Sequence, residues 1–327
     1  ARVHAHVRPG KKIRLSAPQF GIDSYGTWEG GTFELEKESP SSVFSKNAVQ
    51  SALEYLDFKK ISIQPFELET RSDAAFTQGG GKSGLGSSAA VTVAIVSSLL
   101  DFHGVSDLHQ VHRCAQVAHS RGQGKVGSGY DIAACCFGSQ EYKRYTPTLI
   151  EGYPENAEKP WDYFVRSLPL PSFFHIAMAA FPQEGTSTVS MTKHVKAWKE
   201  KDPKAYGTLM RELNEANVNA MAYLEELERG RNRECLEKFR TYFENTWNLT
   251  AELGRKSGAP IEPKEVKEII DMSLQNGAFV CKSPGAGVKD ALAALCLDAK
   301  DKKGLDAFWE SSGLTVLNVS ADNAGVK

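Results

Sequence analysis

The hydrophobic and polar positions change their period along the chain. Before about residue 70, apolar and polar positions mostly alternate over short stretches, as in half-buried strands. After about residue 185, apolar positions mostly recur at helical spacing, and Asp202-Pro203 supplies an N-cap followed by a proline in the first turn. This mixture predicts an α+β fold. A stretch punctuated by prolines, from Pro147 to Pro171, is expected to lie near the boundary between two domains, residues 1–170 and 171–327.

Individual elements follow from the same pattern and from its glycine and proline breaks. Strands are predicted over Arg2–Val7, Lys12–Ser16, Thr32–Lys37, Lys60–Glu69, Ser139–Tyr145, Phe174–Phe181, Ala278–Lys282, Ala291–Leu297 and Thr315–Val319. Helices are predicted over Ser42–Leu56, Ser87–His103, Asp107–Arg121, Thr188–Lys199, Pro203–Glu228, Arg233–Leu253, Pro263–Asn276 and Lys302–Ser311.

Composition narrows the range of partners. The chain has 327 residues, 41% of them apolar, and its 39 basic and 40 acidic residues leave a net charge of -1. Such a balance gives no global field toward nucleic acid or an anionic membrane, so a small-molecule partner is expected. The longest apolar stretch, Ala89–Leu100, is too short for a membrane span. The six cysteines form no CxxC pair, which favours reduced thiols and a cytoplasmic protein.

A glycine-rich loop, Gly79–Ala90, leads into a predicted apolar helix. Glycines let the backbone approach a ligand closely, and a helix N-terminus directs free N–H groups and a positive dipole end at an anion. The loop is therefore a candidate phosphate site. It is not a Walker A loop, because Phe76 stands where that motif needs a glycine. The alternative is a flexible linker in which Ser87 only caps the helix.

Three segments together resemble one family. Gly84-Leu85-Gly86-Ser87-Ser88 resembles the ATP-binding signature of the GHMP kinases, which are named for galactose, homoserine, mevalonate and phosphomevalonate. Lys282–Ala291 resembles their C-terminal glycine loop, although Val288 replaces a usual glycine. Gly124–Asp131 is similar to the fungal and plant type of phosphomevalonate kinase. The resemblance implies a two-domain GHMP kinase fold, with a ribosomal-protein-like N-terminal domain and a ferredoxin-like C-terminal domain carrying added helices.

The resemblance also implies roles for individual residues. Asp131 would be the catalytic carboxylate, which orients the attacking oxygen or accepts its proton; the alternative is a helix N-cap. The ATP phosphates would lie against Gly84, Leu85, Gly86, Ser87 and Ser88, and Mg²⁺ would be reached by Ser87 and Ser88. The acceptor side would include Lys82, Ser128, Ser187, Ala286 and Lys289, although Lys82 is equally well explained as a solvated loop lysine.

One family motif is missing from the front of the chain. GHMP kinases carry a Pro-Gly-Lys motif before a strand, whereas Pro9-Gly10-Lys11 follows the strand Ala1–Val7 and is expected to form a β-turn. Either the protein dispenses with that lysine or the native chain extends upstream of Ala1. The second is expected, because a sheet that begins abruptly leaves a neighbouring strand unpaired.

The histidines invite a different interpretation. His109, His112 and His119 lie on one predicted helix, but no carboxylate completes a metal site and Cys114 falls off that face. The metal expected is Mg²⁺ carried in with ATP.

The resemblance implies transfer of the ATP γ-phosphoryl group to 5-phosphomevalonate, in the mevalonate route to isoprenoids and sterols. Two alternatives remain open. One is mevalonate kinase or another GHMP small-molecule kinase, and the other is an inactive GHMP-fold ligand sensor. The sequence does not determine the oligomeric state.

Overall fold

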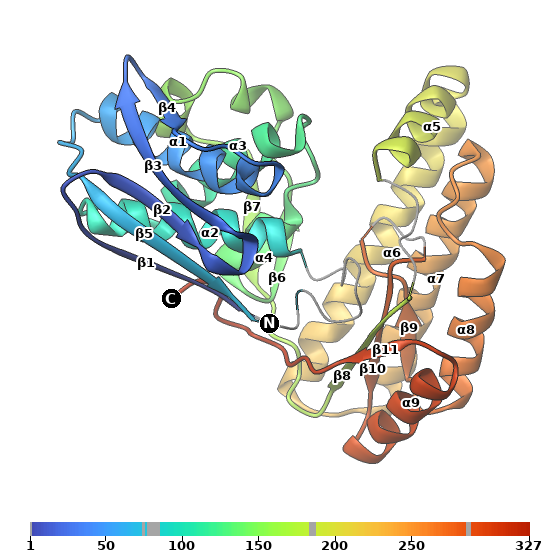
Figure 1. The fold of residues 1–327 in the computed structure, drawn as a ribbon. Helices are drawn as coiled ribbons and strands as arrows, with labels where there is room; N and C mark the ends of the chain where they lie inside the picture. Colours follow the sequence, from blue (N-terminus) through green and yellow to red (C-terminus); the bar gives the residue numbers. More distant parts are fainter. Residues whose placement is uncertain (1, 74–75, 77–85, 183–187, 286–288) are drawn as a thin grey trace. The chain divides into compact units, whose positions relative to one another are not determined.

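The computed structural model describes residues 2–73, 76, 86–182, 188–285 and 289–327. The chain divides into two compact units (Figure 1). Of the described residues, the first unit contains 2–73, 86–167 and 322–327, and the second contains Phe76 and 168–321. None of the helices in the described part of the chain combines the length and apolar character that a membrane span needs.

The described residues of the first unit form a five-stranded sheet in the order β1-β5-β2-β3-β4. β2 runs parallel to β5, and the other neighbours are antiparallel. Helices cover one face (Figure 1). The strands are β1 (Val3–Pro9), β2 (Ile13–Ala17), β3 (Ile22–Glu29), β4 (Thr32–Leu35) and β5 (Phe66–Ser72), and β6 (Gln140–Lys143) pairs separately with β7 (Phe164–Ser167). The helices are α1 (Val43–Phe58), α2 (Ser87–Phe102), α3 (Leu108–Gln123) and α4 (Tyr130–Phe137).

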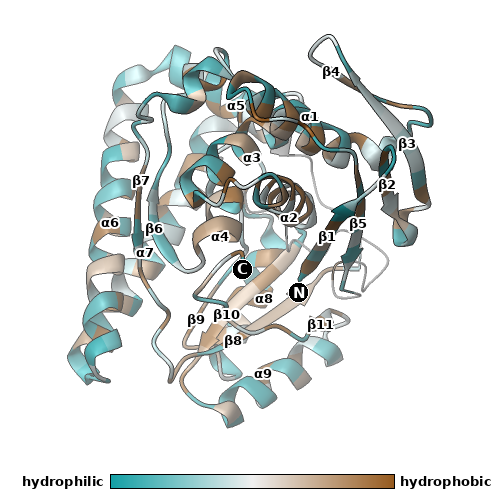
Figure 2. Ribbon diagram, turned by 90° about the vertical axis from the view of Figure 1, so that its left-hand side faces the viewer, coloured by the Kyte–Doolittle hydropathy of each residue, from teal (hydrophilic) through white to brown (hydrophobic). Residues whose placement is uncertain are grey.

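Helix α2 lies inside this unit. It contacts α1, α3, α4 and strand β1, and Figure 2 colours it mainly brown, for hydrophobic side chains. Its apolar residues do not follow a single stripe, because Val91, Val93, Ile95 and Val96 are all buried. A helix that is apolar on most sides is stable only when neighbours cover it on most sides. The start of α2 therefore belongs to a firmly packed element.

The second unit is a helix-rich layer on a small sheet. Its described strands form an antiparallel sheet in the order β11-β8-β10-β9. Their bounds are β8 (His175–Ala180), β9 (Val280–Lys282), β10 (Ala291–Cys296) and β11 (Thr315–Leu317). The helices are α5 (Thr188–Lys201), α6 (Pro203–Arg229), α7 (Arg233–Ser257), α8 (Lys264–Gln275) and α9 (Ala299–Ser311). The side chain of Asp202 accepts from the Ala205 N–H at 2.9 Å, which confirms the predicted N-cap of α6.

Four parts of the secondary structure were missed or misplaced by the sequence prediction. Strand β3 was not predicted, because Asp23, Gly26 and other weak strand formers obscure its alternation. β5 begins only at Phe66, since Pro65 lacks an N–H for a ladder. The apolar run after Asp131 forms helix α4, and β7 lies in a proline-rich stretch for which no strand was predicted.

Candidate active site

The start of α2 carries the described part of the phosphate-loop candidate. Gly86 is the residue before the helix and has φ +69°, a left-handed conformation that favours glycine. Ser87 is exposed and Ser88 is half-buried in the first turn. The N–H groups of this turn have no acceptor within their own helix, which is the arrangement that suits an anion. The predicted residues Lys82, Gly84 and Leu85 lie outside the described residues.

The start of α4 carries Asp131. Gly129 is the N-cap residue, with φ +73°, so the alternative that Asp131 serves as the helix N-cap is wrong. Asp131 lies in the first turn, its side chain 30% exposed, and its Oδ1 accepts from the Ile132 N–H at 2.9 Å. A carboxylate in the first turn is favoured by the helix dipole. The structure therefore presents Asp131 partly open to solvent on a short, well-anchored helix.

His119 of α3 lies between these two helix starts. Its Nε2 is 3.0 Å from Ser88 Oγ, and its Nδ1 is 3.9 Å from Asp131 Oδ2. Gln123, one turn further along α3, places its side-chain nitrogen 3.3 Å from the same Nε2. Burial lowers the pKa of His119, against the opposing effect of the Asp131 carboxylate. A neutral imidazole therefore separates the two predicted site residues at neutral pH.

A second set of contacts fixes the backbone before Asp131. The Gln116 side-chain nitrogen donates to the Gly129 carbonyl at 2.7 Å and lies 3.0 Å from His112 Nε2. Tyr145 donates its hydroxyl hydrogen to Gln116 Oε1 at 3.2 Å. These groups are buried, so each hydrogen bond also avoids the cost of an unpaired polar atom. Gly129, and with it the start of α4, is held from the interior of the unit.

The loop before Gly129 is held at both ends. Gly124 ends α3 in a left-handed conformation, and the Lys125 N–H donates to the Ser120 carbonyl at 3.1 Å. Arg144 donates to the Gly127 carbonyl at 3.0 Å. Ser128, a predicted acceptor-side residue, is exposed on this loop, three residues before Asp131.

The remaining acceptor-side candidates belong to the second unit or are not described. Lys289 lies in the second unit, with its ammonium nitrogen 5.9 Å from the centre of the Phe181 ring. Ser187 and Ala286 lie outside the described residues.

Sequence reasoning did not assign roles to His119, Gln116 or Gln123. Their signal is present, since positions 112, 116, 119 and 123 recur at helical spacing: the first three form a polar stripe on a buried helix face, and Gln123 continues it at the exposed end of the helix. The three histidines of α3 have different surroundings: His109 contacts the Tyr163 hydroxyl, His112 contacts Gln116, and His119 contacts Ser88. Among the described residues, no group of three His, Cys, Asp or Glu side chains is arranged to hold a metal ion.

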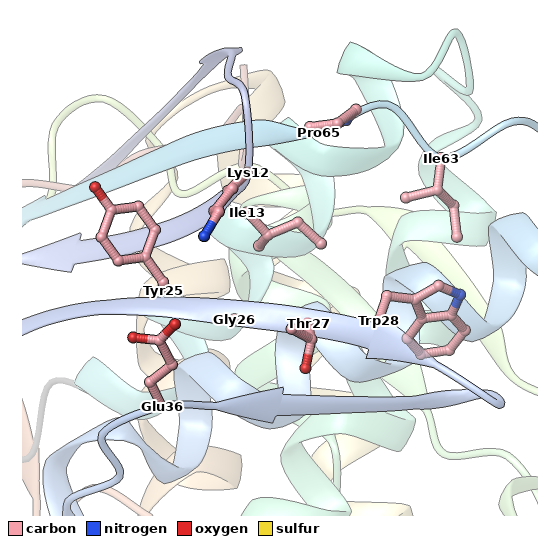
Figure 3. A pocket seen from close by; sticks show the side chains of 9 residues that line it. All are labelled: Lys12, Ile13, Tyr25, Gly26, Thr27, Trp28, Glu36, Ile63 and Pro65. Carbon is pink, nitrogen blue, oxygen red and sulfur yellow. The ribbon is translucent and has the colours of Figure 1, made fainter.

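A shallow pocket of about 330 Å³ lies elsewhere in the first unit (Figure 3). In Figure 3 the Lys12 side chain lies beside Tyr25, and its ammonium is 5.9 Å from the centre of that ring. Residues Lys12, Ile13, Tyr25, Gly26, Thr27, Trp28, Glu36, Ile63 and Pro65 line the pocket. None of the predicted site residues is among them.

Comparison with known proteins places this geometry in a family. The family model described as GHMP kinases N terminal domain matches residues 46–139, which include Ser88, His119 and Asp131, and the model described as GHMP kinases C terminal matches residues 220–311. A phosphomevalonate kinase of Saccharolobus solfataricus is 30% identical over 79% of this chain and 73% of its own length. The chain belongs to the GHMP kinase family. A phosphomevalonate kinase of Aspergillus fumigatus is 29% identical over 94% of the chain and 77% of its own length.

Matches to curated relatives span between 56% and 83% of the relatives' lengths. Among solved structures, a Streptococcus pneumoniae phosphomevalonate kinase in complex with phosphomevalonate and AMPPNP superposes with a TM-score of 0.75 at 18% identity, covering 97% of this chain and 89% of the S. pneumoniae chain. At that identity the likeness concerns the fold alone. It confirms the predicted two-domain GHMP kinase fold of mixed helices and sheets.

Proposed function

We propose that the protein transfers the γ-phosphoryl group of ATP to 5-phosphomevalonate, giving ADP and diphosphomevalonate in the mevalonate pathway. The similarity to the phosphomevalonate kinase of Saccharolobus solfataricus over most of both chains carries this proposal. The described site supports it independently, because it sets a phosphate-suited helix start and a partly exposed carboxylate on either side of one histidine.

The proposal assigns different tasks to the two helix starts. The β and γ phosphates are held by the backbone N–H groups of the loop Gly84-Leu85-Gly86-Ser87-Ser88. Asp131 orients the acceptor. A phosphate acceptor is already anionic near neutral pH, so the carboxylate serves to place it and balance charge rather than to remove a proton.

The serine hydroxyls at the start of α2 are oxygen donors, the ligand type that Mg²⁺ prefers. Ser87 and Ser88 would hold the ion, which would reduce the negative charge of the transferring phosphoryl group.

We further propose that Lys82, Ser128, Ser187, Ala286 and Lys289 bind the acceptor. Ser128 has the best support, since it is exposed on the anchored loop that leads to Asp131. The cytoplasm is the expected location.

The test is an ADP-release assay with 5-phosphomevalonate, and with mevalonate in parallel. Turnover is expected with 5-phosphomevalonate and not with mevalonate. Asp131→Asn should lower kcat by about 10²-fold or more, because a misplaced acceptor loses that order of rate. Asp101→Asn, which removes an exposed carboxylate at the other end of α2, serves as the matched control and should leave kcat unchanged.

Other outcomes would point to the two alternatives. Turnover with mevalonate but not with its phosphate would assign the chain to the mevalonate kinases. Binding of both ligands without ADP release, together with no change in binding on replacing Asp131, would indicate a ligand sensor.

A further inference from the structure

We propose that His119 is a positioning residue that couples the hydroxyl of Ser88 to the carboxylate of Asp131 through one fixed imidazole tautomer. The inference rests on the proposed kinase function for its kinetic consequences. Its structural content concerns the protein without ligand and can be measured separately.

The tautomer follows from Gln123. The Gln123 side-chain nitrogen faces His119 Nε2 at 3.3 Å; because an amide nitrogen only donates hydrogen bonds, this orientation of the amide favours Nε2 as the acceptor. The ring proton of the neutral imidazole is then on Nδ1. That atom faces Asp131 Oδ2, an acceptor, at 3.9 Å. Both ends of the ring therefore favour the same tautomer.

The ring is also held in place by packing. The His119 side chain is only 7% exposed, and the ring of Phe44 lies 5.4 Å from it, centre to centre. A buried ring between an aromatic neighbour and three polar contacts has little freedom to flip. Its orientation is a property of the folded unit and needs no ligand.

The tautomer determines what Ser88 can bind. With Nε2 as the acceptor, the Ser88 hydroxyl donates its single hydrogen to His119 at 3.0 Å. Its oxygen keeps lone pairs and has no second hydrogen to offer a phosphate oxygen. The Ser88 hydroxyl is therefore presented as a ligand for a cation and not as a donor to an anion, whereas the backbone N–H groups remain the anion donors.

The tautomer also determines how Asp131 is oriented. Oδ1 accepts from the Ile132 N–H, and Oδ2 faces the positive edge of the His119 ring. A separation of 3.9 Å is too long for a hydrogen bond, so the attraction is electrostatic in this state. These two contacts favour one orientation of the Asp131 carboxylate about the Cβ–Cγ bond. One buried imidazole links the cation ligand to the acceptor-orienting group.

The first experiment measures the tautomer by ¹⁵N NMR of histidine-labelled protein without ligand, at pH 7. The His119 signals are assigned by their loss in His119→Gln. A protonated Nδ1 and an unprotonated Nε2 are expected, and Ser88→Ala should shift the Nε2 resonance while leaving the tautomer unchanged. A protonated Nε2, or a doubly protonated ring, would overturn the proposal.

The second experiment separates the two links. Binding of AMPPNP is measured by calorimetry with and without Mg²⁺. The ratio of AMPPNP affinity with Mg²⁺ to affinity without it should be at least tenfold smaller in His119→Leu than in the wild type. The kcat of this variant should also be at least tenfold lower. His119→Gln retains an acceptor near the Nε2 position, so the Mg²⁺-dependent gain should return to within about threefold of the wild type while kcat stays low. His109→Leu, on the same helix and away from Ser88, is the matched control and should keep both values.

The results also separate this proposal from the kinase assignment. If the wild type turns over 5-phosphomevalonate and His119→Leu, folded by circular dichroism, matches it in kcat and in Mg²⁺-dependent binding, the coupling is wrong and the kinase function stands. If the wild type shows no turnover, the kinase function fails, and the NMR tautomer with the calorimetry still decides the coupling. If His119→Leu does not fold, the comparison of Mg²⁺-dependent binding with kcat is made on His119→Gln instead. Equal kcat in His119→Gln and wild type would refute the link to Asp131.

Discussion

At the scale of the residue, Gly129 controls where Asp131 stands. It adopts φ +73°, and a Cβ added there would come within 2.5 Å of Gln116 Oε1. The same Gln116 side chain donates to the Gly129 carbonyl. Any side chain at this position therefore strains the backbone and displaces the amide that anchors the start of α4.

Gly129→Ala should lower both stability and activity. The left-handed conformation costs a non-glycine residue about 1–2 kcal/mol, and displacing Gln116 should shift Asp131 enough to lower kcat by about tenfold or more. Urea unfolding and the ADP-release assay measure the two effects. Gly124→Ala is the matched control, since Gly124 has a similar φ of +66° and open space around its Cα. It should lose stability but keep kcat; equal losses of kcat in both variants would contradict a specific role for the Gln116 contact.

The residue types of the site could be predicted only in part. Gly86 and Gly129 are predictable from the sequence, because glycine clusters before helices indicate left-handed caps and close ligand approach. Ser88 and Asp131 follow from the loops and from the family resemblance. His119 does not follow, because helical spacing shows that it shares a face with His112 but not which helices cover that face. Its position between Ser88 and Asp131 depends on how α2, α3 and α4 pack.

At the scale of the element, α3 carries an unusual buried polar stripe. Gln110, His112, Gln116 and His119 are all buried on it. His112 contacts Gln116 through Nε2, and its Nδ1 has no hydrogen-bond partner among the described residues. Burial, with smaller contributions from His109 and Arg113, lowers the pKa of His112 to about 3. Protonation of this ring therefore destabilises the folded state.

The free energy of unfolding should therefore fall as the pH is lowered. Between the unfolded-state pKa of about 6.5 and the folded-state pKa of about 3, the unfolded state binds the extra proton, so stability decreases with falling pH. From pH 7 to pH 5 His112 should contribute roughly 1–2 kcal/mol of this loss. Urea unfolding of His112→Phe at both pH values should show a smaller pH-dependent loss than the wild type. His6→Gln, at an exposed position of β1, should leave the loss unchanged, and an equal slope in His112→Phe would refute the assignment.

Elements with a clear period were predictable and those with a broken one were not. The helices of the second unit have long amphipathic patterns, and the N-cap of α6 is visible as Asp202-Pro203. β3 was missed because Asp23 and Gly26 interrupt it, and it exists because pairing with β2 and β4 satisfies its backbone. The local sequence is enough to predict the amphipathic helices and their caps. Strand β3, by contrast, depends on the strands that lie beside it.

At the scale of the whole molecule, the chain returns to its first unit at the end. Residues 322–327 belong to that unit, although the preceding residues from 168 belong to the other. Gly325 packs against the carbonyl of Cys136, at the end of α4, and Gly138 packs against the Asn323 carbonyl. No local period in the sequence indicates this return, because the contacts involve backbone atoms and two glycines. The division at residue 170 remains a prediction, and the end of the chain lies against the helix that carries Asp131.

The C-terminal residues should therefore stabilise α4. A Cβ at Gly325 would meet the Cys136 carbonyl, and Gly325 also has φ +73°, so Gly325→Ala should destabilise the first unit by about 1–3 kcal/mol. Hydrogen exchange should show lower protection of the amides in Tyr130–Phe137, and deletion of residues 322–327 should lower it further. Gly313→Ala is the matched control, because Gly313 has φ +81° with open space around it and lies in the second unit. Since backbone strain is common to both substitutions, unchanged exchange in α4 with Gly325→Ala would show that the return of the chain contributes no support to the Asp131 helix.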